Sequence, residues 1–341
     1  MAKNFIGIDL GGTNLRAAVI NEAGAILGQA RTETMAKEGP AAVLKRLAIV
    51  ARGAVEEAGL DTTDIVACGV GSPGPLDADE GVVLFSPNLP GWQDVRVAEE
   101  MTRAIDVPTY LENDANAAGW GEFWMGAGRG ATEMVIYTLG TGVGGCVIVD
   151  GKLHRGRDQM AGHLGHAILV PDGRRCNCGA RGCVEQYCSA TAVAREAQTA
   201  TERGLDTGLE DLKISEIDAR AVSEAALAGS EYCAELLART GRYLGIAVAT
   251  AVNILDPQIV VIYGGMAAAG DILLGPCRRA MQEHALSPAR ERVKIVSAEL
   301  DDKAGVVGAA GLALMRQEAA EAAAKAPAPV SERDASAETR Y

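Results

Sequence analysis

The sequence lacks a long hydrophobic segment and an excess of positive charge. No apolar run reaches the roughly 18 residues of a membrane-spanning helix, and a strand pattern begins at Phe5 without the apolar run of a signal peptide. Lysine and arginine number 32 against 45 aspartates and glutamates, which gives a formal net charge of −13. Nucleic acids and anionic membranes bind basic surfaces, so the sequence predicts neither kind of partner.

Disulfide-forming cysteines are also scarce, because eight cysteines in 341 residues are too few for a disulfide scaffold. Five of them are scattered, mostly among apolar neighbours, and are typical of small core residues: Cys68, Cys146, Cys188, Cys233 and Cys277. The simplest account is a protein of the reducing cytoplasm whose remaining thiolates are reserved for metal.

The other three cysteines cluster with a histidine, in the pattern H-x9-C-x-C-x4-C-x-E. The candidate ligands are His166, Cys176, Cys178 and Cys183. Thiolates and a neutral imidazole are the ligands of a closed, tetrahedral structural zinc site, and core packing does not explain their clustering among Gly, Asp and Arg. A complete Cys₃His set leaves no coordination position for water, which argues against a zinc-dependent hydrolase.

A zinc site in this segment would fix the side chains beside it. Glu185 lies two residues after Cys183, and His163 lies three residues before His166. A histidine that binds metal through one ring nitrogen can donate a hydrogen bond from the other. We therefore expect His166 to contact both zinc and substrate, and we expect the metal to hold Glu185 in place.

Hydrophobic periodicity predicts an α/β protein, and the length allows two lobes. The first third reads β-β-β-α-β-α-β, at 5–9, 15–20, 25–31, 40–59, 65–71, 95–105 and 109–112. The second part opens with a strand, a glycine turn and a returning strand, at 134–139, 140–145 and 146–149. Further helices are predicted at 190–203, 219–228, 232–253 and 304–315, and strands at 259–262 and 293–297. The repeated opening indicates a weak internal duplication. Beyond about Gln317 the composition predicts a frayed helix and then disorder.

A Gly-Gly turn, Asp9–Asn14 (DLGGTN), joins the first two predicted strands. It lacks the spacing and the following helix of a dinucleotide-binding fingerprint. Such a turn exposes backbone N–H groups to an anion such as a nucleotide phosphate, and Asp9 at the strand end can hold Mg²⁺ through water. Thr13 and Asn14 can add side-chain donors, and Arg16 a charge if it faces the turn. An ordinary hairpin explains the turn equally well.

A second turn, Thr138–Gly145 (TLGTGVGG), carries four glycines in six residues after an apolar strand. This density implies close backbone approach to a partner, although a glycine-rich bulge is an alternative. Two such turns favour a phosphate clamp in which each lobe supplies one side. Gly264 and Gly265 follow a third apolar strand, and their spacing favours a simple strand end over the floor of an adenine site.

Asn113 and Asp114, in the segment LENDANAA, come at the end of a predicted strand and just before a helix. Side chains at such a position point into a cleft. A carboxylate there can accept the proton of an attacking hydroxyl, which is the general-base role that phosphoryl transfer needs. Capping of the following helix is the commoner use of such a pair, so this motif alone does not decide the function.

Taken in order, these motifs resemble the ROK family (repressors, open reading frames and sugar kinases) from about Phe5 to Met315. The shared segments are DLGGTN at 9–14, GSPG at 71–74, ENDANAA at 112–118, GTGVGG at 140–145 and the cysteine segment at 176–185. SPNLPGW, at 86–92, further resembles the glucokinase-like branch.

The resemblance implies an actin-like, hexokinase-type ATPase fold in which two ribonuclease H-like repeats form lobes around a cleft, with a zinc-binding loop. The implied parts are a small lobe at 1–115, a large lobe at 116–303, a helix at 304–316 that packs back on the small lobe, and a disordered tail at 317–341. It also implies a homodimer or homotetramer.

The implied activity is an ATP-dependent hexose kinase, foremost a glucokinase, with Asp114 as the general base on the sugar 6-hydroxyl. The implied sugar contacts are Gly74, Asn113, Asp114, His163, His166 and Glu185. Mg²⁺ would neutralise phosphate charge with help from Asp9. The implied ATP contacts are Asp9, Gly11, Gly12, Thr13, Asn14, Arg16, Gly140, Thr141, Gly142, Gly144, Gly264 and Gly265.

One departure from the family pattern concerns the sugar. The family usually reads GE[IL]GH, whereas this sequence reads GHLGH with His163 at the glutamate position. Histidine lacks the two anionic oxygens that bind paired hydroxyls. Relatives resembling N-acetylmannosamine kinases also carry histidine here, so such a kinase is the alternative. A sugar-sensing repressor is a different class; it would carry an additional N-terminal DNA-binding domain, for which we expect no room before Phe5.

Overall fold

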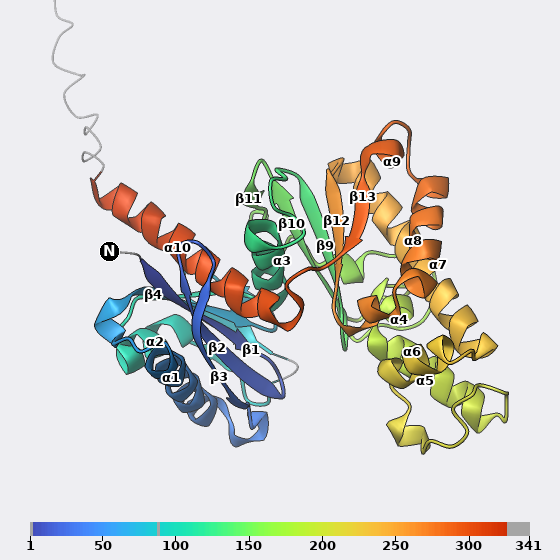
Figure 1. Cartoon of the computed structure of the whole chain (residues 1–341), viewed down its shortest axis with the longest axis horizontal. Helices are drawn as coiled ribbons and strands as arrows, with labels where there is room; N and C mark the ends of the chain where they lie inside the picture. Colours follow the sequence, from blue (N-terminus) through green and yellow to red (C-terminus); the bar gives the residue numbers. More distant parts are fainter. Residues whose placement is uncertain (1–2, 87–88, 326–341) are drawn as a thin grey trace, which may run out of the picture.

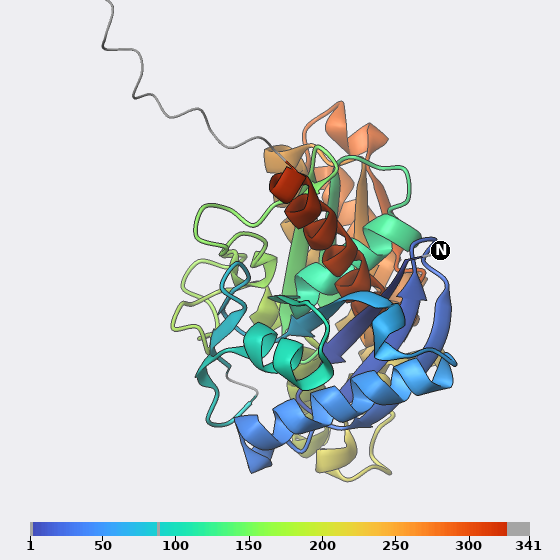
Figure 2. The ribbon, with the colours of Figure 1, turned by 90° about the vertical axis from the view of Figure 1, so that its left-hand side faces the viewer.

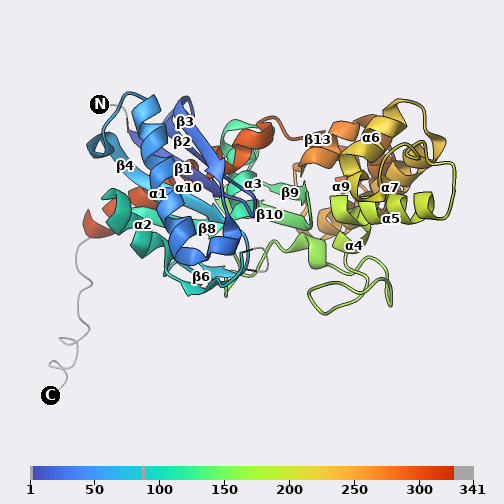
Figure 3. The ribbon, with the colours of Figure 1, turned by 90° about the horizontal axis from the view of Figure 1, so that it is seen from below.

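The computed structural model describes residues 3–86 and 89–325, which form two lobes arranged side by side (Figures 1 and 3). Each lobe is built on a five-stranded sheet. Residues 87 and 88 of the segment SPNLPGW lie outside the described residues. The part of the predicted disordered tail at 326–341 also lies outside them.

The sheet of the first lobe has the strand order β3-β2-β1-β4-β8. Its strands are β1 Asn4–Leu10, β2 Asn14–Asn21, β3 Ile26–Glu33, β4 Ile65–Ser72 and β8 Thr109–Asn113. The first three strands pair antiparallel, whereas β4 runs parallel to both β1 and β8. The carboxyl ends of β1 and β8 therefore lie at the same edge of the sheet, and this edge is where open α/β sheets bind their ligands.

The sheet of the second lobe repeats this topology, with the order β11-β10-β9-β12-β13. Its strands are β9 Met134–Leu139, β10 Val143–Val149, β11 Lys152–Leu153, β12 Ile259–Tyr263 and β13 Lys294–Ser297. Again three antiparallel strands are followed by two parallel ones. A small third sheet, which the sequence patterns did not predict, consists of β5 Leu76–Asp77, β6 Val82–Phe85 and β7 Gln93–Val95.

Helices cover the outer faces of both sheets. On the first lobe these are α1 Pro40–Glu57 and α2 Val97–Ile105, and Figure 2 shows α1 on the opposite side of the sheet from α10. On the second lobe they are α4 Glu185–Cys188, α5 Ala190–Glu202, α6 Ala219–Leu227, α7 Glu231–Leu255, α8 Asp271–His284 and α9 Ala289–Arg292. Short 3₁₀ helices complete the chain: η1 Ala36–Glu38, η2 Thr62–Asp64, η3 Leu164–His166, η4 Ile214–Glu216, η5 Gly265–Ala269 and η6 Asp301–Lys303.

Two helices, α3 Asp114–Met125 and α10 Ala304–Lys325, lie between the sheets (Figure 1). Glycines allow their close packing. A Cβ built on Gly69 of β4 would lie 1.9 Å from the carbonyl oxygen of Ala309, and one on Gly308 would lie 1.6 Å from that of Ala117. Backbone carbonyls cannot move aside as flexible side chains do, so these contacts require glycine. They set α10 against the first sheet and against α3.

The chain crosses from β13 to α10 through a linker that a buried glutamate holds. Glu122 of α3 has no exposed surface. Its carboxylate accepts hydrogen bonds from the backbone N–H groups of Ala127, Glu299 and Leu300, at 2.9, 3.0 and 2.8 Å. A buried carboxylate is stable when its oxygens are fully paired, as here. The linker between the lobes is thereby fixed to α3.

The last helix is longer than the sequence indicated. We expected it to end near residue 316, with a disordered tail from 317, but α10 continues to Lys325. Gln317 accepts a hydrogen bond from the Tyr110 hydroxyl at 3.0 Å, so the start of this additional segment packs on the first lobe. An alanine- and glutamate-rich composition fits a helix as well as it fits disorder, because both residues are strong helix formers. Among the described residues, no helix is both long and apolar enough to span a membrane.

Candidate active site

Asn113 and Asp114 lie where β8 ends and α3 begins. Asn113 is the N-cap of α3, and its side chain accepts hydrogen bonds from the backbone N–H groups of Ala115 and Asn116, at 3.0 and 3.2 Å. The capping role therefore belongs to Asn113. Asp114 accepts only from the N–H of Ala115, at 2.8 Å, among the hydrogen bonds of the described residues. Its carboxylate keeps acceptor capacity for a substrate hydroxyl.

The protein environment makes the Asp114 carboxyl more basic. Burial raises its pKa from the ordinary 3.8 to about 6, and the negative charge of Asp9 adds to the rise. Burial also raises the pKa of Asp9, whereas Arg16 opposes that rise. A carboxylate whose pKa lies closer to neutral is a stronger proton acceptor and is still ionised at pH 7. Asp9, at the end of β1, is thus electrostatically coupled to the end of β8.

The first glycine turn presents two free backbone donors. Gly11 donates its N–H to the carbonyl of Asn14 at 3.0 Å, and Asn14 begins β2 opposite Glu33. For Gly12 and Thr13, both exposed, no hydrogen bond of the N–H group to another described residue exists. Adjacent unpaired N–H groups form an anion-binding concavity.

The second turn repeats this arrangement. The N–H of Gly140 bonds to the carbonyl of Gly142, that of Val143 to Glu185, and that of Gly144 to Thr138. Thr141 and Gly142 are left with N–H groups that no described residue accepts. Each turn therefore contributes a pair of adjacent donors, and the Gly144 N–H predicted to bind phosphate is already satisfied within the turn.

Glycines also bring the second turn close to its neighbours. A Cβ on Gly144 would lie 3.0 Å from the Cβ of Ala115, the residue after Asp114. A Cβ on Gly264 would lie 2.4 Å from the carbonyl oxygen of Leu139, just before the turn, and Gly264 has a φ of 107°. Gly265 faces open space. The structure thus places the second turn beside both the base motif and the Gly264–Gly265 pair.

A hollow between the lobes adjoins the base motif. Its lining includes Gly74, Asn113 and His163 among the predicted residues, and Gln159 and Met160 among those the sequence did not suggest. Burial lowers the pKa of His163, and the nearby His166 lowers it further, which favours the neutral ring. A neutral imidazole offers one donor and one acceptor to a sugar hydroxyl.

The four predicted metal ligands converge. The ligand atoms of His166, Cys176, Cys178 and Cys183 all lie within 4.8 Å of one another. The Sγ atoms of Cys178 and Cys183 are 3.7 Å apart, and Cys176 Sγ is 3.8 Å from His166 Nδ1. Ligands about 2.3 Å from a tetrahedral zinc ion are separated by roughly 3.8 Å, so the spacing of this donor set fits zinc.

Of the predicted sugar contacts, Asp114, Glu185 and His166 lie outside the lining of the hollow. Glu185 begins α4 and connects the cysteine cluster with the second glycine turn, because its Oε2 accepts the N–H of Val143 at 3.1 Å and its Oε1 lies 3.6 Å from Cys176 Sγ. Nδ1 of His166 faces Cys176, which leaves Nε2 as the ring nitrogen turned away from that cysteine.

Arg16 lies opposite Asp9 in the β1–β2 pair and also contacts η6. Its Nη1 donates to the backbone carbonyl of Asp302 at 2.8 Å and lies 3.1 Å from the Asp302 carboxylate. The Arg16 guanidinium is therefore paired with Asp302 of η6 while its charge still acts on Asp9, beside the first glycine turn.

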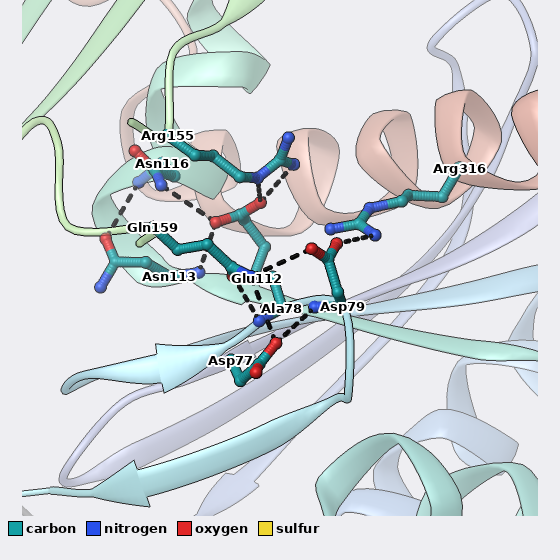
Figure 4. Close-up of polar contacts among 9 residues, drawn as sticks. All are labelled: Asp77, Ala78, Asp79, Glu112, Asn113, Asn116, Arg155, Gln159 and Arg316. Atoms are coloured by element: carbon teal, nitrogen blue, oxygen red, sulfur yellow. Dashed lines mark hydrogen bonds and ion pairs between the residues drawn. The ribbon is translucent and has the colours of Figure 1, made fainter. Parts of the chain in front are cut away.

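The sequence patterns missed two neighbouring sets of polar contacts beside the hollow, drawn in Figure 4. One set joins Glu112 to Arg155, and the other joins Gln159 to Asp77 and Asp79, with Arg316 bound to Asp79. Glu112 belongs to the segment ENDANAA, which resembles the family motif as a whole and gives Glu112 no role of its own. Arg155 and Gln159 belong to a charged loop that contains no recognised motif. A buried glutamate predicts a buried cation as its partner, but sequence alone does not identify which of 32 lysines and arginines that is.

Two sheets of the same topology around a cleft, with glycine turns and a carboxylate at the strand ends, define an actin-like sugar kinase fold. A crystal structure of a ROK glucokinase from Streptomyces griseus, in complex with glucose and AMPPNP, matches this fold with a TM-score of 0.80 and 34% identity over 92% of this chain and 99% of its own.

The model of the ROK family matches residues 5–316, and the chain belongs to this family. A glucokinase of Thermotoga maritima is 37% identical over 313 residues, which are 90% of this chain and 96% of the relative. An N-acetylmannosamine kinase of Escherichia fergusonii is 33% identical over 90% of this chain and 97% of its own. The resemblance inferred from the motifs is therefore confirmed.

Proposed function

We propose that this protein is an ATP-dependent kinase that transfers the γ-phosphoryl group of ATP to the 6-hydroxyl of glucose. The observation that carries the proposal is the position of Asp114, a carboxylate of raised pKa at the start of α3, beside Asp9 and next to the second glycine turn. The relatives named glucokinase, and the neighbour that binds glucose and an ATP analogue, support the acceptor and the donor.

In the proposed reaction Asp114 accepts the proton of the 6-hydroxyl as that oxygen attacks the γ-phosphorus. A P–O bond forms to the sugar, the bond between the γ-phosphorus and the bridging oxygen breaks, and ADP leaves. Asn113, Gly74 and His163 line the hollow in which the sugar would bind. His166 and Glu185 would reach the sugar from the cysteine cluster. Holding both reactants in line is the main contribution of an enzyme to this chemistry.

The backbone donors of the two turns that no described residue accepts would hold the phosphates of ATP. Gly12 and Thr13 would contribute from the first lobe, and Thr141 and Gly142 from the second, with the Gly264–Gly265 pair beside the adenosine. Mg²⁺ bound to ATP supplies positive charge that neutralises the phosphates. Asp9 is the carboxylate suited to hold its water ligands, because it lies near the end of β1, two residues before Gly11 of the first glycine turn.

Zinc, held by His166 and the three cysteines, would have a structural role. The spacing of the four ligands and the contact of Glu185 with Cys176 Sγ support this. The metal would fix the segment that carries His163, His166 and Glu185. A homodimer or homotetramer stays an expectation, which light scattering of the purified protein tests.

N-acetylmannosamine is the alternative acceptor, favoured by His163 in the lining of the hollow. Coupled assays with ATP and Mg²⁺, on glucose, mannose, N-acetylglucosamine and N-acetylmannosamine, distinguish the two. We expect the largest kcat/KM for glucose. A larger value for N-acetylmannosamine would establish the alternative, and sugar binding without turnover would indicate a sensor in place of an enzyme.

A further inference from the structure

We propose that Arg155 is a positioning residue for phosphoryl transfer: it reaches from the second lobe to Glu112 and, through Glu112, orients the Asn113–Asp114 pair. The proposal rests on the kinase function proposed above. Arg155 does not contact the reacting atoms, and its effect would pass through the backbone that carries the base.

Arg155 begins a loop that belongs to the second lobe. The loop follows β11, and the N–H of Ala161 bonds back to the carbonyl of Arg155 at 2.9 Å. We call Arg155–Ala161 the interlobe loop. Figure 4 shows Arg155 directed at Glu112, on β8 of the first lobe. The contact therefore joins the two lobes beside the hollow.

Glu112 is nearly inaccessible, with 5% of its surface exposed. Its Oε2 accepts from Arg155 Nε at 2.7 Å, and its Oε1 accepts from the backbone N–H of Asn113 at 3.0 Å and from Asn116 Nδ2 at 2.9 Å. A buried carboxylate without a cation is costly, and Arg155 is the cation that offsets the burial of Glu112. Both oxygens are occupied, which fixes the plane of the carboxylate.

That plane determines how the base motif is held. The N–H of Asn113 is bound to Glu112, and the Asn113 side chain caps α3 through Ala115 and Asn116. Asp114 lies between these two fixed groups, as the first residue of α3. A rotation of Glu112 would therefore move the backbone on both sides of Asp114. Displacement of a reacting group by about 1 Å can cost roughly 100-fold in rate.

The other end of the interlobe loop is also bound to the first lobe. Gln159 Oε1 accepts from the backbone N–H of Ala78 at 2.6 Å, and its Nε2 donates to Asp77 and Asp79 at 3.2 and 3.1 Å (Figure 4). Gln159 has a φ of 60°, a strained conformation for a residue with a side chain, and these bonds hold it there. Both ends of the interlobe loop thus contact the first lobe, at Glu112 and at Ala78.

The experiment compares steady-state kinetics of the wild type with Arg155→Met, Arg155→Lys, Glu112→Gln and the double variant Arg155→Met/Glu112→Gln. Arg155→Met should lower kcat by roughly 100-fold while the KM for ATP changes less than about threefold. Arg155→Lys, which keeps the charge, should recover at least about a tenth of the wild-type kcat. The double variant should be no slower than the slower single variant, because both changes remove one contact.

Two further variants keep the outcome decisive. Arg220→Met removes the arginine of an exposed pair with Glu224 on α6 and should keep wild-type kinetics. If Arg155→Met does not fold, Glu112→Gln, which preserves shape and the Oε1 acceptor, must lower kcat at least about tenfold. A kcat within about threefold of the wild type in both single variants, or losses that multiply in the double variant, would overturn the proposal. An inactive wild type would instead refute the kinase function on which it rests.

Discussion

Replacement of Asp114 by asparagine should abolish activity and at the same time stabilise the folded protein, in a manner that depends on pH. The substituted asparagine would keep the shape of the side chain and its acceptor for the N–H of Ala115, but it would carry no charge. In the wild type, burial and Asp9 raise the pKa of Asp114 from 3.8 to about 6. The folded protein therefore disfavours the ionised form that catalysis needs.

The sign and size of this stability change follow from the linkage between folding and proton binding. Below pH 3.8 the carboxyl is protonated in both folded and unfolded chains, and the charge costs nothing. The cost grows as pH rises and is complete above pH 6, where raising the pKa from 3.8 to about 6 corresponds to about 3 kcal/mol. At pH 5 about half of this cost is present. Asp114→Asn should thus gain up to about 3 kcal/mol over the wild type at pH 8, and about 1.5 kcal/mol at pH 5.

Urea unfolding at pH 5 and pH 8 measures this difference. Asp206→Asn, a change at an exposed aspartate, is the matched control and should show the same stability relative to the wild type at both values. Loss of a positioned general base lowers turnover by about 10²- to 10⁴-fold. A variant that is less stable than the wild type at pH 8, or equally stable at both pH values, would refute a charged Asp114 in a desolvated site.

The pH dependence of wild-type kcat/KM provides a further test. This ratio should fall below about pH 6 with unit slope and reach about a tenth of its plateau near pH 5. A flat profile down to pH 5 would exclude Asp114 as the base. Gly144→Ala should destabilise the protein by about 1–3 kcal/mol, because the added Cβ would lie 2.5 Å from Thr138 Oγ1. Gly140→Ala is the control and should leave stability unchanged, because its Cβ would meet open space. Equal urea midpoints for the two variants would contradict this prediction. Elemental analysis of the wild type should find one zinc ion per chain. Cys178→Ser should lose this zinc and raise the KM for glucose by roughly tenfold. A metal-free wild type with normal kinetics would show that zinc has no part in activity. His163→Glu should raise the ratio of kcat/KM for glucose over N-acetylmannosamine by about tenfold, and an unchanged ratio would show that this residue does not select the sugar.

Local sequence signals predicted the elements that position the site. The strands around the first turn, 5–9 and 15–20, correspond to β1 Asn4–Leu10 and β2 Asn14–Asn21, because buried strands are read from short apolar runs between glycine turns. The four metal ligands converge as their spacing indicated, since ligand chemistry and sequence spacing are both local properties.

Features that depend on long-range contacts were not predictable in this way. Helix α8 continues through Gly275 and Pro276, which by propensity break helices, because it packs against α7 over much of its length. The tie of Arg16 to Asp302 joins residues far apart in sequence. The pairing of Arg155 with Glu112 is of the same kind, and only the arrangement of the two lobes brings them together.

Formation of glucose 6-phosphate, detected by a dehydrogenase specific for that product, tests the central claim most directly when wild type and Asp114→Asn are measured side by side. The account predicts ATP-dependent turnover of glucose by the wild type, and a loss of about 100-fold or more in the variant while glucose binding persists. Turnover in the variant within about tenfold of the wild type, or no glucose 6-phosphate from the wild type, would contradict it.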